Sequence, residues 1–468
     1  MEIGVSRNAP WGKKLNSNAT VVRGVAWTVG TYALSIVFRF GSNVILSRLL
    51  NPELFGIMLI INTIRQGIEL TSDVGFAQNV IQNKAGDQPA FFNTVWVMQI
   101  MRGFLLGALL FFCATSIGDL YSVPATAFEI SAAILLVSGL ASTSIFRLHR
   151  NLQLAKLNLF DLSQDAIGAI IVIAAAVVNP TIESLLIATL GAQLIRTLSS
   201  YFLTSDGNQF QFSKRYALEV LTFGRWIFFS SILMFLCASF DRLYLGKVAP
   251  LAVVGVYGIA RALADMPTYL AARVGYSVIF PIVSWSQSAA RSELRAQLSS
   301  IRLKLLLVAA VGVAFGISIA DIAITLIYDA RYHDAAWMLP LLLFGAWLAI
   351  LCSISEYAML GFGKPSYNVV GNGIKLAYYV MVLPLAYQKM GIFGAIVAVA
   401  FSEIGRYVVI GIGQRREQFS FLKQDAAATL VFIGLVIAMS WVRSLAGFGT
   451  AFDSVPLEQI GWMFGKAE

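Results

Sequence analysis

The chain has 468 residues, of which 58% are hydrophobic and 13% charged, and its mean hydropathy is +0.74. A charged fraction about half that of ordinary soluble domains excludes a water-soluble fold. The formal net charge of +9 does not indicate nucleic acid as a partner, because the basic residues stand in short joints between apolar stretches rather than in one soluble patch. The composition therefore predicts an all-α integral membrane protein.

Apolar stretches of about twenty residues, the length of a membrane-crossing helix, follow one another along the chain. The first six expected spans are 22–48, 53–82, 91–117, 126–147, 159–178 and 183–203. The second six are 226–245, 252–282, 303–327, 336–361, 367–388 and 391–413. A thirteenth apolar stretch covers 426–447, and the side of the membrane that holds the carboxyl terminus stays open.

The two sets of six spans resemble each other. Gln193 to Arg196 matches Glu403 to Arg406, and Lys156 in its joint matches Lys364. Since each set is even, the halves are expected to be parallel repeats related by an axis along the membrane normal, with the substrate site at their interface. The predicted divisions are an N-terminal six-helix lobe 1–205, a cytoplasmic connector 206–225, a C-terminal six-helix lobe 226–413, and a basic joint with the thirteenth span and tail 414–468.

Most Lys and Arg residues in the joints fall on the side of the amino terminus, among them those around Lys214 and Arg295. Cytoplasmic loops of membrane proteins retain positive charge. The amino terminus is therefore expected in the cytoplasm.

Polar residues inside four spans recur at helical spacing, so that each set lies on one face of its helix. The four faces carry Thr28, Thr31, Ser35, Arg39 and Ser42 on the first span, Asn62, Arg65, Gln66, Glu69 and Asp73 on the second, Arg261, Asp265 and Thr268 on the eighth, and Asn368, Asn372, Lys375 and Tyr379 on the eleventh. Because buried charge is costly in a bilayer, such faces usually line a bundle interior or a watery cavity. The cations of these faces are thus candidate ligands for an anion near mid-membrane, namely Arg39, Arg65, Arg261 and Lys375. Arg273 is a fifth candidate, at a different angle around the eighth helix.

For Arg65 and Arg261, a local ion pair within one helix is the alternative to binding an anionic ligand. Arg65 with Glu69, and Arg261 with Asp265, have the i, i+4 spacing of local ion pairs. Arg39 and Lys375 have no acidic residue within one turn of their own helices, so each must find a partner elsewhere or meet an anionic ligand. Asn62, Gln66, Asn372 and Tyr379 are candidates to bind sugar hydroxyls, although such residues also join helices to one another.

The chain lacks sequence signatures of catalysis. It has no phosphate-binding loop of the GxxxxGK[ST] form, and its two histidines, His149 and His333, are expected at opposite membrane faces. Its three cysteines fall singly in separate apolar stretches. We therefore expect no enzyme activity, no catalytic residue, no metal and no cofactor.

The segment Ser47 to Gly56, then Asp73-Val74-Gly75-Phe76 and the basic joint Arg150 to Lys156, resemble the polysaccharide-transporter flippases of the multidrug, oligosaccharidyl-lipid and polysaccharide exporter superfamily. The resemblance covers the twelve repeated spans. It implies two six-helix lobes around a central cavity that opens alternately to each side. It also implies cavity arginines on the first, second and eighth helices, where Arg39, Arg65 and Arg261 stand.

By the same resemblance, the substrate is an undecaprenyl-diphosphate-linked oligosaccharide, moved to the outer leaflet for capsule, exopolysaccharide or O-antigen assembly. The resemblance implies a location in the bacterial cytoplasmic (inner) membrane. Membrane lipid and the polymerase and export proteins of such a pathway are the implied partners. Two alternatives stay open: a cation-coupled drug antiporter of the same superfamily, and a polytopic polysaccharide polymerase or ligase. The energy source is open too, since Glu69, Asp73 and Asp265 are candidates to bind a coupling proton or sodium ion, whereas an anionic substrate would also follow the membrane potential.

Overall fold

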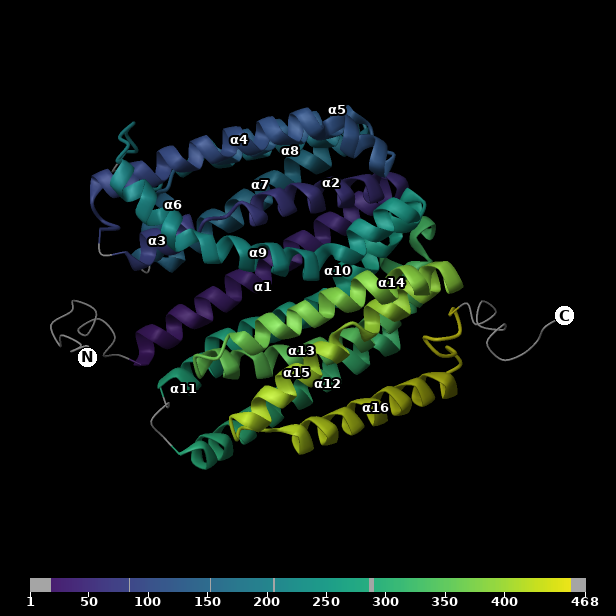
Figure 1. Cartoon of the computed structure of the whole chain (residues 1–468). Helices are drawn as coiled ribbons and strands as arrows, with labels where there is room; N and C mark the ends of the chain where they lie inside the picture. The colour runs from purple at the N-terminus through teal and green to yellow at the C-terminus, as the bar shows by residue number, and fades with distance from the viewer. Residues whose placement is uncertain (1–17, 84, 152, 205–206, 286–289, 456–468) are drawn as a thin grey trace. The chain divides into compact units, whose positions relative to one another are not determined.

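The computed structural model describes residues 18–455 except 84, 152, 205–206 and 286–289, and every regular element in this part is helical. The chain forms two compact units, one of Met1–Leu49 with Ser72–Phe228 and the other of Leu50–Thr71 with Phe229–Glu468. The second unit thus takes one helix, α2, from the amino-terminal part of the chain (Figure 1). The lobe boundaries expected from the repeat remain a prediction.

The helices of the first unit are α1 (Asn18–Leu49), α3 (Phe76–Gln82), α4 (Pro89–Tyr121), α5 (Ala125–Gly139), α6 (Ser144–Arg150), α7 (Leu154–Val178), α8 (Ile182–Ser200) and the first part of α9 (Lys214–Val248). The second unit holds α2 (Pro52–Thr71), the rest of α9, α10 (Leu251–Val274), the π-helical turn η1 (Gly275–Ile279), α11 (Phe280–Trp285), α12 (Arg291–Ile327), the 3₁₀ turn η2 (Ala330–Tyr332), α13 (Ala335–Gly361), α14 (Ser366–Phe401), α15 (Glu403–Arg416) and α16 (Leu422–Leu445).

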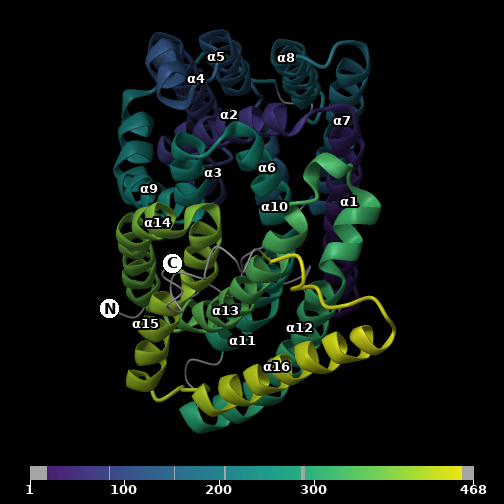
Figure 2. The ribbon, with the colours of Figure 1, turned by 90° about the vertical axis from the view of Figure 1, so that its right-hand side faces the viewer.

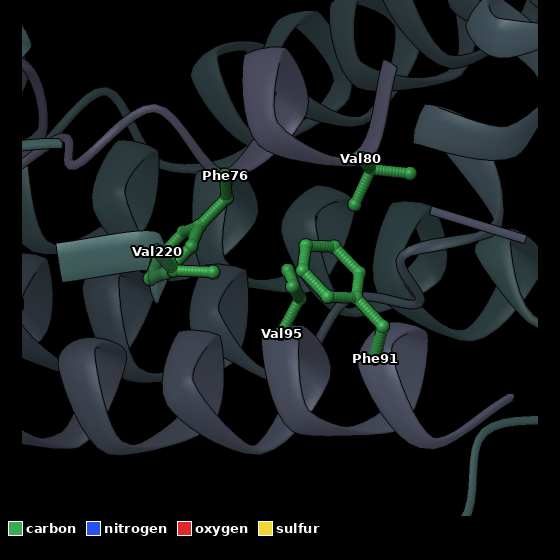
Figure 3. Packing of buried hydrophobic residues seen from close by; sticks show 5 residues of the cluster. All are labelled: Phe76, Val80, Phe91, Val95 and Val220. Atoms are coloured by element: carbon green, nitrogen blue, oxygen red, sulfur yellow. The ribbon is translucent and has the colours of Figure 1, made fainter. Parts of the chain in front are cut away.

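The first unit is built around α4, which lies beside α5, while α5 and α7 pack on α8 (Figures 1 and 2). A buried apolar cluster joins the short α3 to α4 and to the first part of α9; Figure 3 shows its members, which are Phe76, Val80, Phe91, Val95 and Val220. This cluster fixes α3, a helix of only two turns that propensity alone would not hold.

The expectation of one continuous span over 53–82 is wrong. Helix α2 ends at Thr71 and α3 begins at Phe76. Between them Asp73 accepts a hydrogen bond from the backbone N–H of Gly75 at 2.9 Å, and Gly75 takes φ 71°, which favours glycine. The short Asp-Val-Gly turn therefore interrupts the apolar pattern, which by itself did not reveal the break.

Two further spans depart from a straight helix. The expected span 126–147 is a pair, α5 and α6, bent by 54°. Residues 366–401 are continuous in hydrogen bonding but turn at Gly391, where φ is 59°, so the expected boundary between 388 and 391 is confirmed. Helix α10 continues through Pro267, and the first irregular turn after it is η1.

The second unit depends on a close approach of α2 and α10. A Cβ atom added to Gly56 would lie 2.0 Å from the Leu251 carbonyl oxygen, and one added to Gly255 would lie 1.9 Å from the Pro52 carbonyl oxygen. Only glycine at both positions lets the two backbones meet.

The thirteenth apolar stretch is the helix α16, which lies against α12 (Figure 2). Buried ion pairs join the two helices near both ends of α16: Arg302 to Asp425 at 2.5 Å, and Arg443 to Asp321 at 2.5 Å. Trp347 of α13 stacks on Phe432, with ring centroids 4.7 Å apart. Helix α16 is thus an integral part of the second unit.

By length and composition, seven helices in the described part can each cross a membrane, or eight if the bent pair α5 and α6 counts as one span. The stretch Ser366–Arg416 counts once in that number although it contains the turn at Gly391. The protein is therefore a multi-pass membrane protein, and the expected total of twelve, thirteen or fourteen crossings stays open.

Candidate functional site

Arg261, a predicted cation of α10, belongs to a buried network with the carboxyl-terminal part of α9. The Arg261 Nε atom lies 3.3 Å from Asp265 and 3.6 Å from Asp241. Arg242 donates to the same Asp265 at 3.0 Å, and the Tyr257 hydroxyl donates to Asp241. The expected local pair of Arg261 with Asp265 is present. Two arginines and two carboxylates therefore balance one another inside the second unit, with Asp241 fully buried.

On α2 the polar face has the local pairing that its spacing predicts. Arg65 donates to the Asn62 side-chain oxygen at 3.1 Å and lies 3.8 Å from Glu69. Its side chain is 23% exposed and that of Glu69 is 37% exposed. Gln66 is exposed on the same helix. These residues are accessible to a ligand, whereas the α10 network is largely enclosed.

Lys375 finds its partner on another helix. Its Nζ atom lies 2.5 Å from the Glu403 carboxylate of α15, which Arg406 contacts at 3.2 Å from the other side. Arg406 also pairs with Glu356 of α13. The Lys375 side chain is 9% exposed, and its ammonium lies 5.6 Å from the centre of the Tyr379 ring. Lys375 and Tyr379 are thus packed inside the second unit in this conformation.

Asn372 and Arg273 are two further predicted residues of the second unit. The Asn372 carbonyl oxygen accepts from the Cys237 thiol at 3.0 Å, and Arg273 is exposed in the last turn of α10. A role of either residue in binding substrate stays a prediction.

In the first unit, Arg39 of α1 lies 3.2 Å from Asp165 of α7, and 72% of its side chain is exposed. Asp73 does not lie on a helical face as expected, because it stands in the turn before α3 and stabilises that turn. A role of Asp73 in ion coupling stays a prediction. Arg39 has the open environment that an anion-binding cation requires.

Sequence reasoning missed Asp241 and assigned no role to Glu403 or Arg406. Each is an ionisable residue within an apolar stretch, and that position is a usable signal, since such residues are rare in membranes and find partners there. The signal was weak because neither carboxylate stands in a polar stripe.

The arrangement is one of paired charges. Guanidinium and ammonium groups are donors for phosphate oxygens, and Arg39, Arg65, Arg261 and Lys375 each have a carboxylate beside them. Within residues that the structure describes, no group of three or more His, Cys, Asp or Glu side chains is placed to hold a metal ion.

Comparison with known proteins agrees with a transport protein. The chain is 22% identical over 382 residues to the succinoglycan biosynthesis transport protein ExoT of Rhizobium meliloti (strain 1021), an alignment that covers 81% of this chain and 75% of that protein. It is 23% identical over 266 residues to the lipopolysaccharide biosynthesis protein WzxC of Escherichia coli (strain K12), with 56% of this chain and 54% of that protein covered.

Two solved structures share the fold. The lipid II flippase MurJ in an inward closed conformation matches with a TM-score of 0.74 at 13% identity, covering 93% of this chain and 95% of that one. An inward-facing multidrug resistance transporter of the MATE family in the MOP superfamily matches with a TM-score of 0.58 at 14% identity, covering 86% and 95%. The similar proteins whose names state an activity are transporters and a flippase. None of these names is that of an enzyme, in agreement with the prediction from the sequence.

The model of the polysaccharide biosynthesis protein family matches residues 45–337, which is more than half of the chain. This match confirms the resemblance noted in the sequence. The chain therefore belongs to the polysaccharide biosynthesis protein family.

Proposed function

We propose that the protein moves an undecaprenyl-diphosphate-linked oligosaccharide from the cytoplasmic to the outer leaflet of the bacterial cytoplasmic membrane, for capsule, exopolysaccharide or O-antigen assembly. The observation that carries the proposal is the match to the polysaccharide biosynthesis protein family over residues 45–337. The relative named for succinoglycan transport supports a saccharide, and the lipid II flippase with the similar fold supports a lipid-linked one.

The cations of the two units fit the charge of such a substrate. A diphosphate link presents oxygens that arginine and lysine bind well. We propose Arg39, Arg65 and Arg261 as its main ligands, with Asn62 and Gln66 toward the sugar. Arg242 and Arg261 share Asp265, so Arg242 keeps that carboxylate neutralised when an opening of the unit turns Arg261 to a phosphate. Transport then follows alternating access, in which the loaded site opens first to one side and then to the other.

The direction of transport has a simple electrostatic source. A diphosphate carries roughly two negative charges, and moving each outward in a cell with a negative interior is favourable by about 2.3 kcal/mol per 100 mV. We propose that the potential drives export, with Glu69, Asp73 and Asp265 as the alternative sites of ion coupling. Reconstituted liposomes with a valinomycin-set potassium potential, at equal pH and sodium, test this. If the flipping rate does not depend on the sign of the potential but does depend on a pH or sodium gradient, potential-driven export is wrong and ion antiport is the mechanism.

The export function itself is tested by deleting the gene and locating the lipid-linked saccharide. A flippase deletion traps complete units at the inner leaflet. Loss of a polymerase leaves single units outside, and loss of a drug antiporter changes drug tolerance instead. The proposed orientation, with the amino terminus in the cytoplasm, predicts that cysteines placed at Lys214 or Arg295 do not react with an impermeant maleimide added to intact cells.

A further inference from the structure

Helix α15 leads into α16 through a short loop (Figure 2), and a cavity of about 170 Å³ lies at this junction in the second unit. The stretches Ser366–Arg416 and Leu422–Leu445, which end and begin beside it, are long and apolar enough to cross a membrane. The lining residues belong to one continuous described part of the chain, and they are Tyr407, Val408, Gly411, Ile412, Gln414, Arg415, Ser420, Leu422 and Asp425. None of them is proposed above as a ligand of the transported substrate. The cavity is much larger than a single water molecule requires.

Two lining residues have buried polar atoms without a hydrogen-bond partner among the described residues. Gln414 is 3% exposed, and its side-chain nitrogen, a donor, is one of these atoms. Asp425 is 2% exposed, and its Oδ1 atom, an acceptor, is the other, although it forms an ion pair with Arg302. Buried polar groups are normally satisfied by a protein group, a water or a ligand. A hydroxyl group both donates and accepts, so one placed in the cavity can satisfy the amide and the carboxylate together.

The charge of Asp425 is balanced from inside the protein. Arg302 of α12 lies 2.5 Å from its carboxylate, and the Tyr407 hydroxyl donates to the other carboxylate oxygen at 3.0 Å. Arg415 is the cation of the lining, and it is exposed and forms no ion pair with a described residue. The open side of the cavity therefore attracts an anion, whereas its buried side suits a neutral hydroxyl group.

An exposed aliphatic stripe on α15 leads away from the cavity. Ile404, Val408 and Ile412 recur every four residues and are 46%, 52% and 46% exposed. A ligand that suits all three features has hydrocarbon chains, an anionic phosphate and hydroxyl groups beyond it, and basic pockets between transmembrane helices bind lipid headgroups. We propose that this cavity binds phosphatidylglycerol, with the phosphate at Arg415, the glycerol hydroxyls at Gln414 and Asp425, and an acyl chain along the stripe.

Native mass spectrometry of the detergent-purified full chain tests the proposal, with phosphatidylglycerol, phosphatidylethanolamine and phosphatidic acid as probes. The unchanged protein retains phosphatidylglycerol in preference to phosphatidylethanolamine, which has no net charge, and to phosphatidic acid, which has no glycerol headgroup. Arg415→Gln reduces the preference over phosphatidylethanolamine about fivefold, as expected for one cation near a headgroup. Gln414→Leu reduces the preference over phosphatidic acid about threefold, because it removes one hydrogen-bond donor to the glycerol.

The matched control is Arg416→Gln, which removes the same charge from the next residue, exposed as well but not part of the lining. It keeps both preferences. Arg415 is exposed, so Arg415→Gln decides the matter if Gln414→Leu does not fold.

Equal retention by Arg415→Gln and the control overturns the proposal. An unchanged preference over phosphatidic acid in folded Gln414→Leu shows that water alone fills the buried side of the cavity, and this result overturns it as well. Undecaprenyl diphosphate that displaces phosphatidylglycerol at equal concentration assigns the cavity to the transported lipid and overturns it too.

Discussion

Two lone cations, Arg39 in the first unit and Lys375 in the second, look alike in the sequence but have different environments. Arg39 pairs with Asp165 at 3.2 Å while 72% of its side chain stays exposed. Lys375 pairs with Glu403 at 2.5 Å, and both side chains are less than 10% exposed. Breaking a buried pair leaves an uncompensated charge, whereas an exposed pair contributes little to stability. A cation in a polar stripe is thus open to a ligand in one unit and part of the core in the other.

The largest expected effect is at Glu403, which lies between Lys375 and Arg406. Glu403→Gln leaves the Lys375 ammonium without its carboxylate in a buried place, so we expect the free energy of unfolding to fall by about 3–5 kcal/mol. The midpoint of thermal unfolding in detergent, followed with purified protein, measures the loss.

The double variant Lys375→Met with Glu403→Gln is the control for that result. It removes both charges of the pair and leaves Arg406 with Glu356, so it is expected to be more stable than Glu403→Gln alone. A double variant as unstable as the single one would show that the Lys375 charge is not what destabilises the protein.

The repeat supplies a second contrast between the units. Arg406 and Arg196 occupy matching positions in the repeat. Arg406 contacts two carboxylates and is 13% exposed, whereas Arg196 contacts one carboxylate among the described residues, that of Asp161, and is 34% exposed. We expect Arg406→Gln to cost about 3 kcal/mol of unfolding free energy and Arg196→Gln about 1 kcal/mol or less. The same unfolding measurement applies, and equal losses would contradict the contrast in burial.

The smallest effect on stability is expected at Arg39. Arg39→Ala removes an exposed pair and should lower the free energy of unfolding by less than about 1 kcal/mol, while export is lost if the guanidinium binds the diphosphate. Asp165→Asn is the matched control, because it breaks the same pair and keeps the cation. Export that survives Arg39→Ala would remove Arg39 from the proposed ligands.

Lys375→Ala is a less specific test of the proposed ligands, because the buried position of Lys375 predicts a loss of stability as well as a loss of export.

The sequence by itself determined the membrane class, most of the helical stretches, the boundary between 388 and 391 and the local pairs of Arg65 and Arg261. These follow from hydropathy over twenty residues and from spacing within one helix, which are local properties of the chain. Only the tertiary structure decided the partners of Arg39 and Lys375, because Asp165 lies 126 residues from Arg39, and Glu403 belongs to a different helix from Lys375. It also decided that α2 packs with α10 through Gly56 and Gly255 in the second unit, since contact between helices depends on shapes that no single segment contains.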